Sequence, residues 1–453
     1  MVKVGLEIHG YLNTKEKLFC RCKSIHGAKF SKPNTNICPV CTAQPGAKPM
    51  LPNSKAVEKA IEISLILECK IFPQFSFQRK HYDWPDMPKG FQSTISGPHA
   101  TPVGVGGKFL GIKITEAHLE EDPAAWNPLT GEIDYNRSGS PLIEIVTEPD
   151  FKSAEQVVSW LKQLVVTLDY IKAIDKNSGI KVDVNVSLPE FKTERAEIKN
   201  INSLSGVKAA IEYEIVRQKK EKPIRKETRA YDESKGVTIK MREKELAQDY
   251  RFISEPDLPV LKIEKSRIEK IKSSLPETPH EKLAKLVKKH KIKKEYAEIL
   301  TKKLDIVEFF EKIIGKVKNP ELAVHWVAGE LSRVLNYAKK EIADVDINPG
   351  HFIELLNLIE KNTITALKAK EILNEFIPKS FSPKEKLKAS AKISGGEIES
   401  ICAKVIKENQ KAVQDYKDGN FSALNFLLGQ VMRHSGKRAD SSEARKILER
   451  MIS

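Results

Sequence analysis

The sequence predicts an α+β protein in which a strand-rich region comes first and a helical region follows. Up to about residue 260, short runs of alternating apolar and polar residues stand between Gly, Pro and Asn, a pattern typical of half-buried strands. Two longer segments in this region carry apolar residues at three- and four-residue spacing, as amphipathic helices do. After Pro256 and Pro259, helical patterns take over. Strands mixed with helices in this way favour an α+β layer over a parallel, doubly wound sheet.

The predicted helices of the first region lie at 54–67 and 153–171, each with a serine that can cap its start. Alternation predicts strands in "GIKIT" (111–115), "IEIVTE" (143–148) and "GIKVDVNVSL" (179–188). Turn residues in "NPLTGEID" predict a hairpin. We interpret "GVGGKF" (104–109) as another hairpin turn, because it lacks the spacing of a phosphate-binding loop and the Ser or Thr after its lysine.

The remainder of the chain is predicted to be helical. One helix is expected over 319–342, with Asn319 as its cap and Pro320 at its first position. Near the end, Asp440 and Glu443 form a variant of the capping box. Two glycines in "KISGGEIES" suggest a further boundary. We therefore expect three domains, at 1–262, 263–392 and 393–453.

Composition restricts the classes of protein that fit. The 453 residues carry a formal net charge of +15, and no apolar run approaches the ~18 residues that suggest a membrane span. The first residues, "MVKVGLEIHGYL", alternate like a strand and do not resemble a signal peptide, so we expect a cytoplasmic protein. The basic surplus favours a polyanionic partner such as nucleic acid. A lysine-rich solvated surface, as in heat-adapted proteins, is the alternative.

Four of the six cysteines stand close together, as Cys20 and Cys22 in "CRC" and Cys38 and Cys41 in "CPVC". Two such pairs, separated by a loop, suit tetrahedral thiolate ligation of zinc. Disulfides are disfavoured because nothing indicates an oxidising compartment. Four thiolates leave no open position for a substrate, so the predicted zinc site is structural. Cys69 and Cys402 are expected to be buried small apolar residues.

Acidic residues and histidines recur at two-residue spacing in the predicted strands. "HLEED" contains His118, Glu120, Glu121 and Asp122, and alternation sends the first two to one face of a strand and Glu121 to the other. The same pattern occurs at several other places in the first domain, with candidate side chains Glu7, His9, Glu144, Glu148, Asp183, Asn185, Glu197 and Lys199. Like charges so close need solvation, protonation or a cation. Converging strands of this kind predict an oxygen-rich site for Mg²⁺.

Basic residues are interleaved with these acids, namely Arg79, Lys80, Lys89, Arg137 and Arg229. Acids that hold a metal, together with Arg and Lys that clamp phosphates, are the components of a phosphoryl-transfer site. Each stretch alone is more often a solvated surface, and the number of such stretches is what favours a metal and phosphate site.

The order of the motifs resembles that of the GatB family, the B subunit of the tRNA-dependent amidotransferase. The motifs that carry this resemblance cover nearly the whole chain: "VGLEIHGYLNTKEKLFC", "CPVCTAQPGAKPMLPN", "RKHYDWPDMPKGFQ", "HLEEDPAAW", "DYNRSGSPLIEIVTEPD", "DVNVS", "EIKNINS", "KETRAYDE", "MREKE", "DYRFISEPDLP" and "ALNFLLGQVMRHSGKRAD". The related E subunit carries a large inserted domain, for which this chain has no room after "EPDLP".

The resemblance implies a glutamine synthetase-like cradle domain, a helical domain and a small helical tail. It implies an ATP- and Mg²⁺-dependent ligase that phosphorylates the side-chain carboxylate of Glu or Asp mischarged on tRNA and then amidates it. A glutaminase (A) subunit would supply ammonia, and a small C subunit would bridge the two. Glu-tRNA(Gln) and Asp-tRNA(Asn) remain equally open as the main substrate.

The resemblance also implies roles for individual residues. Magnesium ligands would be Glu7, His9 and Glu120. The other acids, His118 and Lys199 would complete the catalytic site, while the interleaved cations with Asp183 and Asn185 would bind the nucleotide. In the tail, Arg433, Lys437 and Arg438 would meet tRNA phosphates, although a solvated helix end explains them equally well. Two alternatives stay open: a zinc-containing tRNA- or ribosome-binding factor without catalysis, and a metal-dependent nuclease.

Overall fold

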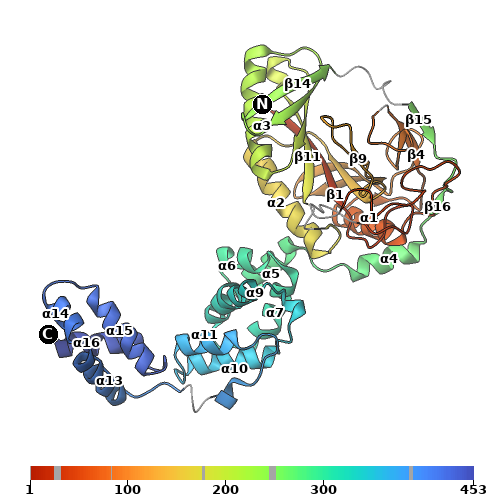
Figure 1. Ribbon diagram of the computed structural model, residues 1–453. Helices are drawn as coiled ribbons and strands as arrows, with labels where there is room; N and C mark the ends of the chain where they lie inside the picture. The colour runs from red at the N-terminus through yellow and green to blue at the C-terminus, as the bar shows by residue number, and fades with distance from the viewer. Residues whose placement is uncertain are drawn as a thin grey trace. The chain divides into compact units, whose positions relative to one another are not determined.

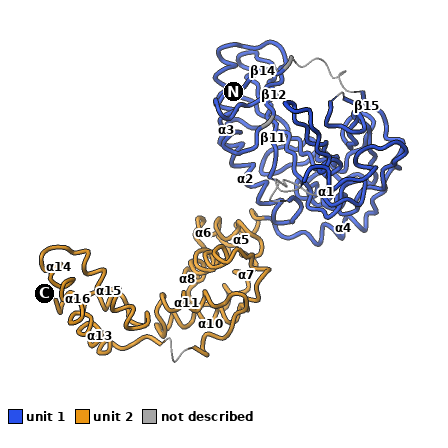
Figure 2. The backbone as a smooth tube through the Cα atoms, viewed as in Figure 1, with its two compact units in different colours: residues 1–278 blue, residues 279–453 orange. Residues whose placement is uncertain are grey.

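The computed structural model describes residues 2–24, 32–82, 84–175, 179–243, 251–386 and 391–452. The chain divides into two compact units, residues 1–278 and 279–453 (Figure 2). Within the described ranges, no helix is both long enough and apolar enough to cross a membrane.

Figure 1 shows unit 1, which is built on a large mixed sheet. The strand order is β14-β13-β12-β11-β1-β10-β7-β5-β4-β15, and β6 and β2 branch from β7. Neighbouring strands pair antiparallel, except β12 and β13, which are parallel. The strands are β1 (Lys3–Tyr11), β2 (Lys70–Ile71), β4 (Gln78–His81), β5 (Phe91–Thr94), β6 (Gly104–Phe109), β7 (Ile112–Glu121), β10 (Pro141–Thr147), β11 (Ile180–Ser187), β12 (Ala196–Ile201), β13 (Glu227–Asp232), β14 (Val237–Glu243) and β15 (Arg251–Ser254).

Three helices pack on this sheet and bury its apolar residues. They are α1 (Ser54–Ile66), α2 (Ala154–Tyr170) and α3 (Leu204–Glu221). Helix α1 contacts β6 and β7, α3 contacts β11 and β12, and α2 lies beside α3. The helices predicted at 54–67 and 153–171 are thus confirmed, and Ser153 caps the second as expected. The predicted serine cap of the first helix is wrong, because Asn53 accepts the hydrogen bonds from the backbone N–H groups of Lys55 and Ala56 and Ser54 is the first helical residue.

The described part of unit 1 also contains two short two-stranded sheets. Strands β8 (Ala125–Trp126) and β9 (Ile133–Asp134) flank the turn predicted in "NPLTGEID", which is confirmed. Strands β3 (Gln74–Phe75) and β16 (Leu261–Lys262) also pair, and α4 (Lys265–Ser274) follows.

The prediction of a hairpin turn at 104–109 is wrong. These residues form strand β6, and the chain turns at Leu110 and Gly111 before β7 begins. The glycines permit close packing here, because a Cβ at Gly107 would lie only 2.3 Å from the carbonyl oxygen of Leu67. Glycine in a strand marks such close backbone approaches as well as turns.

Unit 2 is helical. Its α-helices are α5 (Pro279–His290), α6 (Lys294–Leu300), α7 (Leu304–Ile314), α8 (Pro320–Val324), α9 (Ser332–Ala338), α10 (Pro349–Glu360), α11 (Ala366–Asn374), α13 (Gly395–Glu408), α14 (Gln410–Lys417), α15 (Ala423–His434) and α16 (Ser441–Ile452). The helix expected over 319–342 is capped by Asn319, but His325–Leu331 within it is a π-helix and the helical run ends at Ala338.

The residues after 392 have a hydrophobic cluster of their own. It joins α13, α14, α15 and α16 through the buried side chains Ile398, Cys402, Val405, Val413, Leu427, Val431 and Leu448. Asp440 accepts hydrogen bonds from the backbone N–H groups of Ser442 and Glu443 and so caps α16, which confirms the Asp440 half of the predicted capping box. Burial of Cys402 and Cys69 also agrees with the sequence.

Candidate active site and metal centre

Alternation along the central strands separates an apolar face of the sheet from a polar face. On β1, every second side chain belongs to the core formed with the helices: Val4, Leu6 and Ile8. Glu7 and His9 therefore lie on the opposite face. The register extends this face, because His9 pairs with Glu144 of β10 and Glu144 pairs with His118 of β7. Cross-strand partners share a face, so side chains far apart in sequence meet there.

The first cluster on the polar face joins two histidines and two glutamates. Nε2 of His9 lies 3.5 Å from Oε2 of Glu144 and 3.8 Å from Oε1 of Glu120. Nε2 of His118 lies 2.9 Å from the same Glu144 oxygen. One possible ligand atom from each of His9, Glu120 and Glu144 lies within 4.8 Å of the other two, so the three side chains are close enough to hold one metal ion.

Burial and charge shift the pKa values in this cluster strongly. Burial lowers the pKa of His118, but the charge of Glu144 and hydrogen bonds to Glu116 and Glu144 raise it to about 10. Burial also lowers the pKa of His9, and Glu144 and Glu120 raise it to about 9. Although burial raises the pKa of Glu144, the two histidines hold it well below its usual range. A cation that takes His9 as a ligand must therefore displace its proton.

The second cluster lies on the neighbouring strands β11 and β12. Glu7 pairs with Asp183, and Asn185 with Glu197. Nζ of Lys199 donates to Oδ2 of Asp183 at 2.6 Å and lies 3.0 Å from Oε1 of Glu197. Burial raises the pKa of Glu7, and the charges of Glu144 and Glu197 raise it further. This shift shows that the two clusters interact electrostatically.

The atoms of the second cluster suit a hard cation. Carboxylate oxygens of Glu7, Asp183 and Glu197 lie within 4.8 Å of one another. Asn185 donates to Oε1 of Glu7 at 3.0 Å, while its own Oδ1 is buried and accepts no hydrogen bond from the part of the chain that is described. Carboxylate and amide oxygens are the ligands that Mg²⁺ prefers.

The predicted phosphate-binding cations lie in four different places. Lys80 pairs with Gln92 of β5, two residues before Thr94, which pairs with Glu120, so alternation places Lys80 on the face of Glu120. Burial and the charge of Glu144 raise the pKa of Glu120, and the charge of Lys80 partly offsets this increase. Arg137 lies at the end of β7, where its guanidinium donates to the carbonyl oxygens of Pro123 and Ala124 at 3.0 Å.

Arg79 and Lys89 face a separate pocket of about 290 Å³, which Cys20 and Cys41 also line. Arg79 donates to Glu255 and Asp257 at 2.8 Å. Lys89 pairs with Glu121, which points away from Glu120 as alternation predicts. These residues are not brought together with the acids of the polar face.

Two predicted site residues lie elsewhere. Arg229 is on the α3 side of β13, where Nε donates to Oγ1 of Thr238 at 2.8 Å. Glu148 follows the end of β10 and accepts a hydrogen bond of 2.9 Å from Oγ1 of Thr115. The structure does not bring either residue to the two clusters.

Sequence reasoning missed Tyr11, and it counted Asp122 among the clustered acids without assigning it a role. The hydroxyl of Tyr11 donates to Oδ2 of Asp122 at 2.8 Å, and this oxygen lies 3.4 Å from Nε of Arg137. Tyr11 continues the alternation of Glu7 and His9 along β1, which is the signal that points to it.

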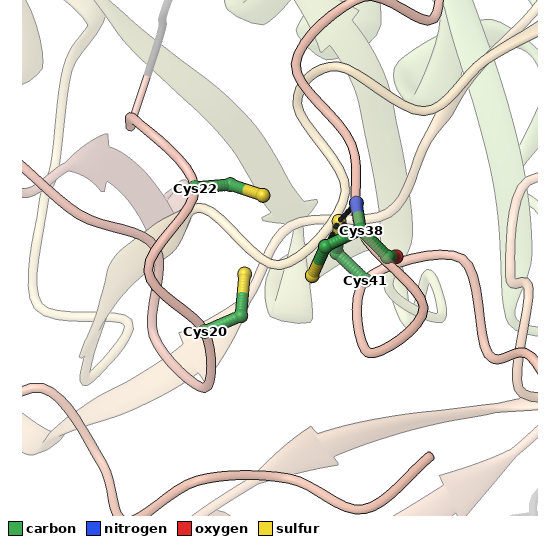
Figure 3. A group of neighbouring side chains, drawn as sticks. All are labelled: Cys20, Cys22, Cys38 and Cys41. Atoms are coloured by element: carbon green, nitrogen blue, oxygen red, sulfur yellow. Dashed lines mark hydrogen bonds between the residues drawn. The ribbon is translucent and has the colours of Figure 1, made fainter. Parts of the chain in front are cut away.

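The four clustered cysteines come together from two loops. Figure 3 shows Cys20 and Cys22 facing Cys38 and Cys41, and the four sulfur atoms lie within 4.8 Å of one another. The backbone N–H of Cys38 donates to Sγ of Cys41 at 3.2 Å. A hydrogen bond from Cys20 has the largest effect on the pKa of Cys41 and lowers it. The backbone N–H of Cys38 and the charge of Lys17 lower it further, to about 5, although burial acts in the opposite direction. The cluster can hold a metal ion, and its four thiols fit a thiophilic one such as zinc.

The basic residues of the tail lie at the end of α15. Arg433 and Lys437 are exposed and Arg438 is partly exposed. Nζ of Lys437 lies 2.6 Å from Oε1 of Glu371, and Nε of Arg438 donates to the carbonyl oxygen of Ser435 at 3.3 Å. Part of this basic turn therefore has partners within unit 2.

The fold and site together define an α+β protein with a sheet-borne cluster of acids and histidines, a cysteine centre and a helical second unit. Family models agree with this class: the GatB/GatE catalytic domain matches residues 2–269, and the GatB domain matches residues 308–452. The chain belongs to the GatB family.

Curated relatives match over the full length of the chain. The B subunit of the aspartyl/glutamyl-tRNA(Asn/Gln) amidotransferase of Methanothermobacter thermautotrophicus is 42% identical over 459 residues, covering 100% of both chains. The protein of the same name from Methanobrevibacter smithii is 43% identical over 456 residues, covering 99% of each chain. That of Methanococcus maripaludis strain S2 is 41% identical over 468 residues, covering 100% of this chain and 98% of the relative.

Proposed function

We propose that this chain is the B subunit of an aspartyl/glutamyl-tRNA(Asn/Gln) amidotransferase. The observation that carries the proposal is the match to relatives of that name over the full chain. The convergence of acids and histidines from β1, β7, β10, β11 and β12 supports it, because this is the region matched by the catalytic-domain model.

The proposed reaction has two steps. A side-chain carboxylate oxygen of Glu or Asp on tRNA attacks the γ-phosphorus of ATP, and ADP leaves. Ammonia from a glutaminase A subunit then attacks the acyl carbon. The bond between this carbon and the phosphorylated oxygen breaks, and phosphate leaves with that oxygen. A small C subunit completes the assembly. Both steps need positive charge beside the phosphate oxygens and fixed positions for the reactants.

The two clusters fit this task. Glu7, His9 and Glu120 are the proposed magnesium ligands, with Glu144, Asp183 and Glu197 as the remaining acids. Bound Mg²⁺ would offset phosphate charge. His118 orients Glu144 through their 2.9 Å contact, and Lys199 holds Asp183 and Glu197 in place.

Lys80 and Arg137 are the proposed phosphate-binding cations. Lys80 lies on the polar face of the sheet, and Arg137 contacts the residues that follow the end of β7. Arg229 and Glu148 are not part of this proposed site, since their partners lie away from the clusters.

The test combines the purified chain with its proposed glutaminase and bridging partners, ATP, Mg²⁺, glutamine, and either Glu-tRNA(Gln) or Asp-tRNA(Asn). The amino acid released from the tRNA is then identified. Conversion to Gln or Asn supports the proposal and identifies the substrate. If neither forms while tRNA still binds, the proposal is overturned in favour of a binding factor without catalysis.

The four cysteines are the proposed zinc ligands. Cys20→Ser and Cys41→Ser should each lower the bound zinc, measured by elemental analysis, and reduce thermal stability, because a structural zinc site contributes directly to folding. Cys402→Ala, in the separate tail cluster, should keep full zinc content. Unchanged zinc content and folding in both serine variants would contradict the assignment.

The basic turn after α15 is a proposed tRNA contact. Replacing Arg433 and Arg438 together by glutamine should weaken tRNA binding and reduce the slope of log affinity against log salt by about one unit per lost phosphate contact. Replacing Lys404 and Lys407 together by glutamine, at two exposed positions on α13, removes the same two charges and serves as the control in a filter-binding titration. An unchanged slope in the arginine variant would eliminate this contact.

A further inference from the structure

Lys17 is a buried lysine beside the four-cysteine centre. Only 1% of its surface is exposed, which makes it one of the largest fully buried side chains among the described residues. An isolated ammonium group in such a position is costly, because burial removes its hydration. The burial of Lys17 therefore requires a compensating negative charge or several acceptors.

The contacts of Lys17 identify that compensation. Its ammonium group donates to the carbonyl oxygens of Asn36 at 3.1 Å and Tyr135 at 3.3 Å. Its third contact is Sγ of Cys41, at 3.5 Å. The three contacts use the three N–H bonds of the ammonium group, and the described part of the chain places no carboxylate within ion-pair distance of it.

The charge of Lys17 would balance part of the negative charge of a metal centre formed by the four cysteines. A divalent cation held by four thiolates carries a net charge of −2, and a buried ammonium at 3.5 Å from one sulfur offsets half of it. We propose that Lys17 is the counter-charge of the cysteine metal centre and ties this centre to the turn before β10. The inference rests on a metal being held by these four cysteines.

The backbone around Lys17 and Cys41 is hydrogen-bonded to the turn before β10. The N–H of the next residue, Leu18, donates to the carbonyl oxygen of Gly139 at 2.8 Å, and the hydroxyl of Ser138 donates to the carbonyl oxygen of Cys41 at 2.9 Å. Gly139 in turn donates to the carbonyl oxygen of Asp122, at the end of β7. The segment 135–140 thus connects the metal centre to β7 and β10, which carry Glu120 and Glu144.

The experiment measures Co²⁺ affinity and the Co²⁺ absorption spectrum of the full chain by competition with a chromophoric chelator. Lys17→Met should bind Co²⁺ ~10–100-fold more weakly than the unmodified chain, as expected when a group that supports metal ligands is removed. Lys17→Arg keeps the charge and should bind more tightly than Lys17→Met. Lys15→Met, an exposed lysine in the same loop, is the matched control and should match the unmodified chain.

Each other outcome overturns a defined statement. If the unmodified chain shows no tetrathiolate Co²⁺ spectrum, the metal assignment itself fails, and the role of Lys17 with it. If that spectrum is present but Lys17→Met binds within threefold of the unmodified chain, only the role of Lys17 fails. The proposed amidotransferase function stands or falls separately, in the tRNA assay.

A measurement on the unmodified chain covers the case in which Lys17→Met does not fold. Amine-reactive acylation, followed by mass spectrometry, should leave Lys17 unmodified in the metal-loaded protein and modify it after the metal is chelated. Lys15 should react in both states. Equal protection of Lys17 with and without metal would overturn the inference, because its burial would then not depend on the charge of the metal centre.

Discussion

Replacing Glu120 or Glu144 by glutamine should lower the rate of tRNA-dependent amidation by about 10²-fold or more, the scale expected when a charged group in a preorganised site is removed. Both residues contact His9, and Glu144 also contacts His118. Glutamine keeps the volume of the side chain but removes the negative charge. The measurement is the amount of Gln-tRNA or Asn-tRNA formed by the assembled enzyme under single-turnover conditions.

A binding measurement separates this result from simple misfolding. Mn²⁺ binding, followed by electron paramagnetic resonance, should weaken in both variants while the far-ultraviolet circular dichroism stays unchanged. Glu58→Gln is the control, because Glu58 pairs with Lys55 on α1, away from the polar face of the sheet. Full amidation activity in Glu120→Gln would remove Glu120 from the proposed site.

Glu214→Gln should destabilise unit 1 by about 3–5 kcal/mol, the range found when one partner of a buried ion pair is removed. Glu214 is fully buried on α3 and accepts hydrogen bonds from Arg217, from Nε2 of Gln218 at 2.9 Å and from Oγ1 of Thr238 at 3.1 Å. Nε of Arg229 also lies 3.7 Å from it. The neutral glutamine would leave both arginines with less compensation.

Urea denaturation of the full chain, followed by tryptophan fluorescence, measures this effect. Glu212→Gln is the matched control on the same helix, since Glu212 is 52% exposed and pairs only with Lys208 among the contacts described. A control change of this kind is expected to stay within about 0.5 kcal/mol. If Glu214→Gln unfolds at the same urea concentration as the control, the buried network contributes little to stability.

Arg229 and Lys199 lie on opposite faces of the sheet, which alternation within a single strand does not reveal. Both are basic residues in alternating segments, and both were expected at the site. Lys199 pairs with acids of the polar face, whereas Arg229 joins Glu227 and Thr238 on the α3 side. Alternation tells which residues of one strand share a face, but strand register decides which face that is relative to the neighbouring strand.

The strand-rich first region, the helices at 54–67 and 153–171, the two cysteine pairs and the motifs of the GatB family can all be recognised in the sequence alone. These features depend on local spacing and side-chain chemistry, which a single chain segment already contains. Three contacts become visible only in the folded chain: His9, Glu120 and Glu144 meet, Arg79 and Lys89 line a different pocket, and Lys17 is buried against Cys41. These contacts join residues from separate strands and loops. They depend on strand register and on the packing of distant segments, and a local sequence pattern contains neither.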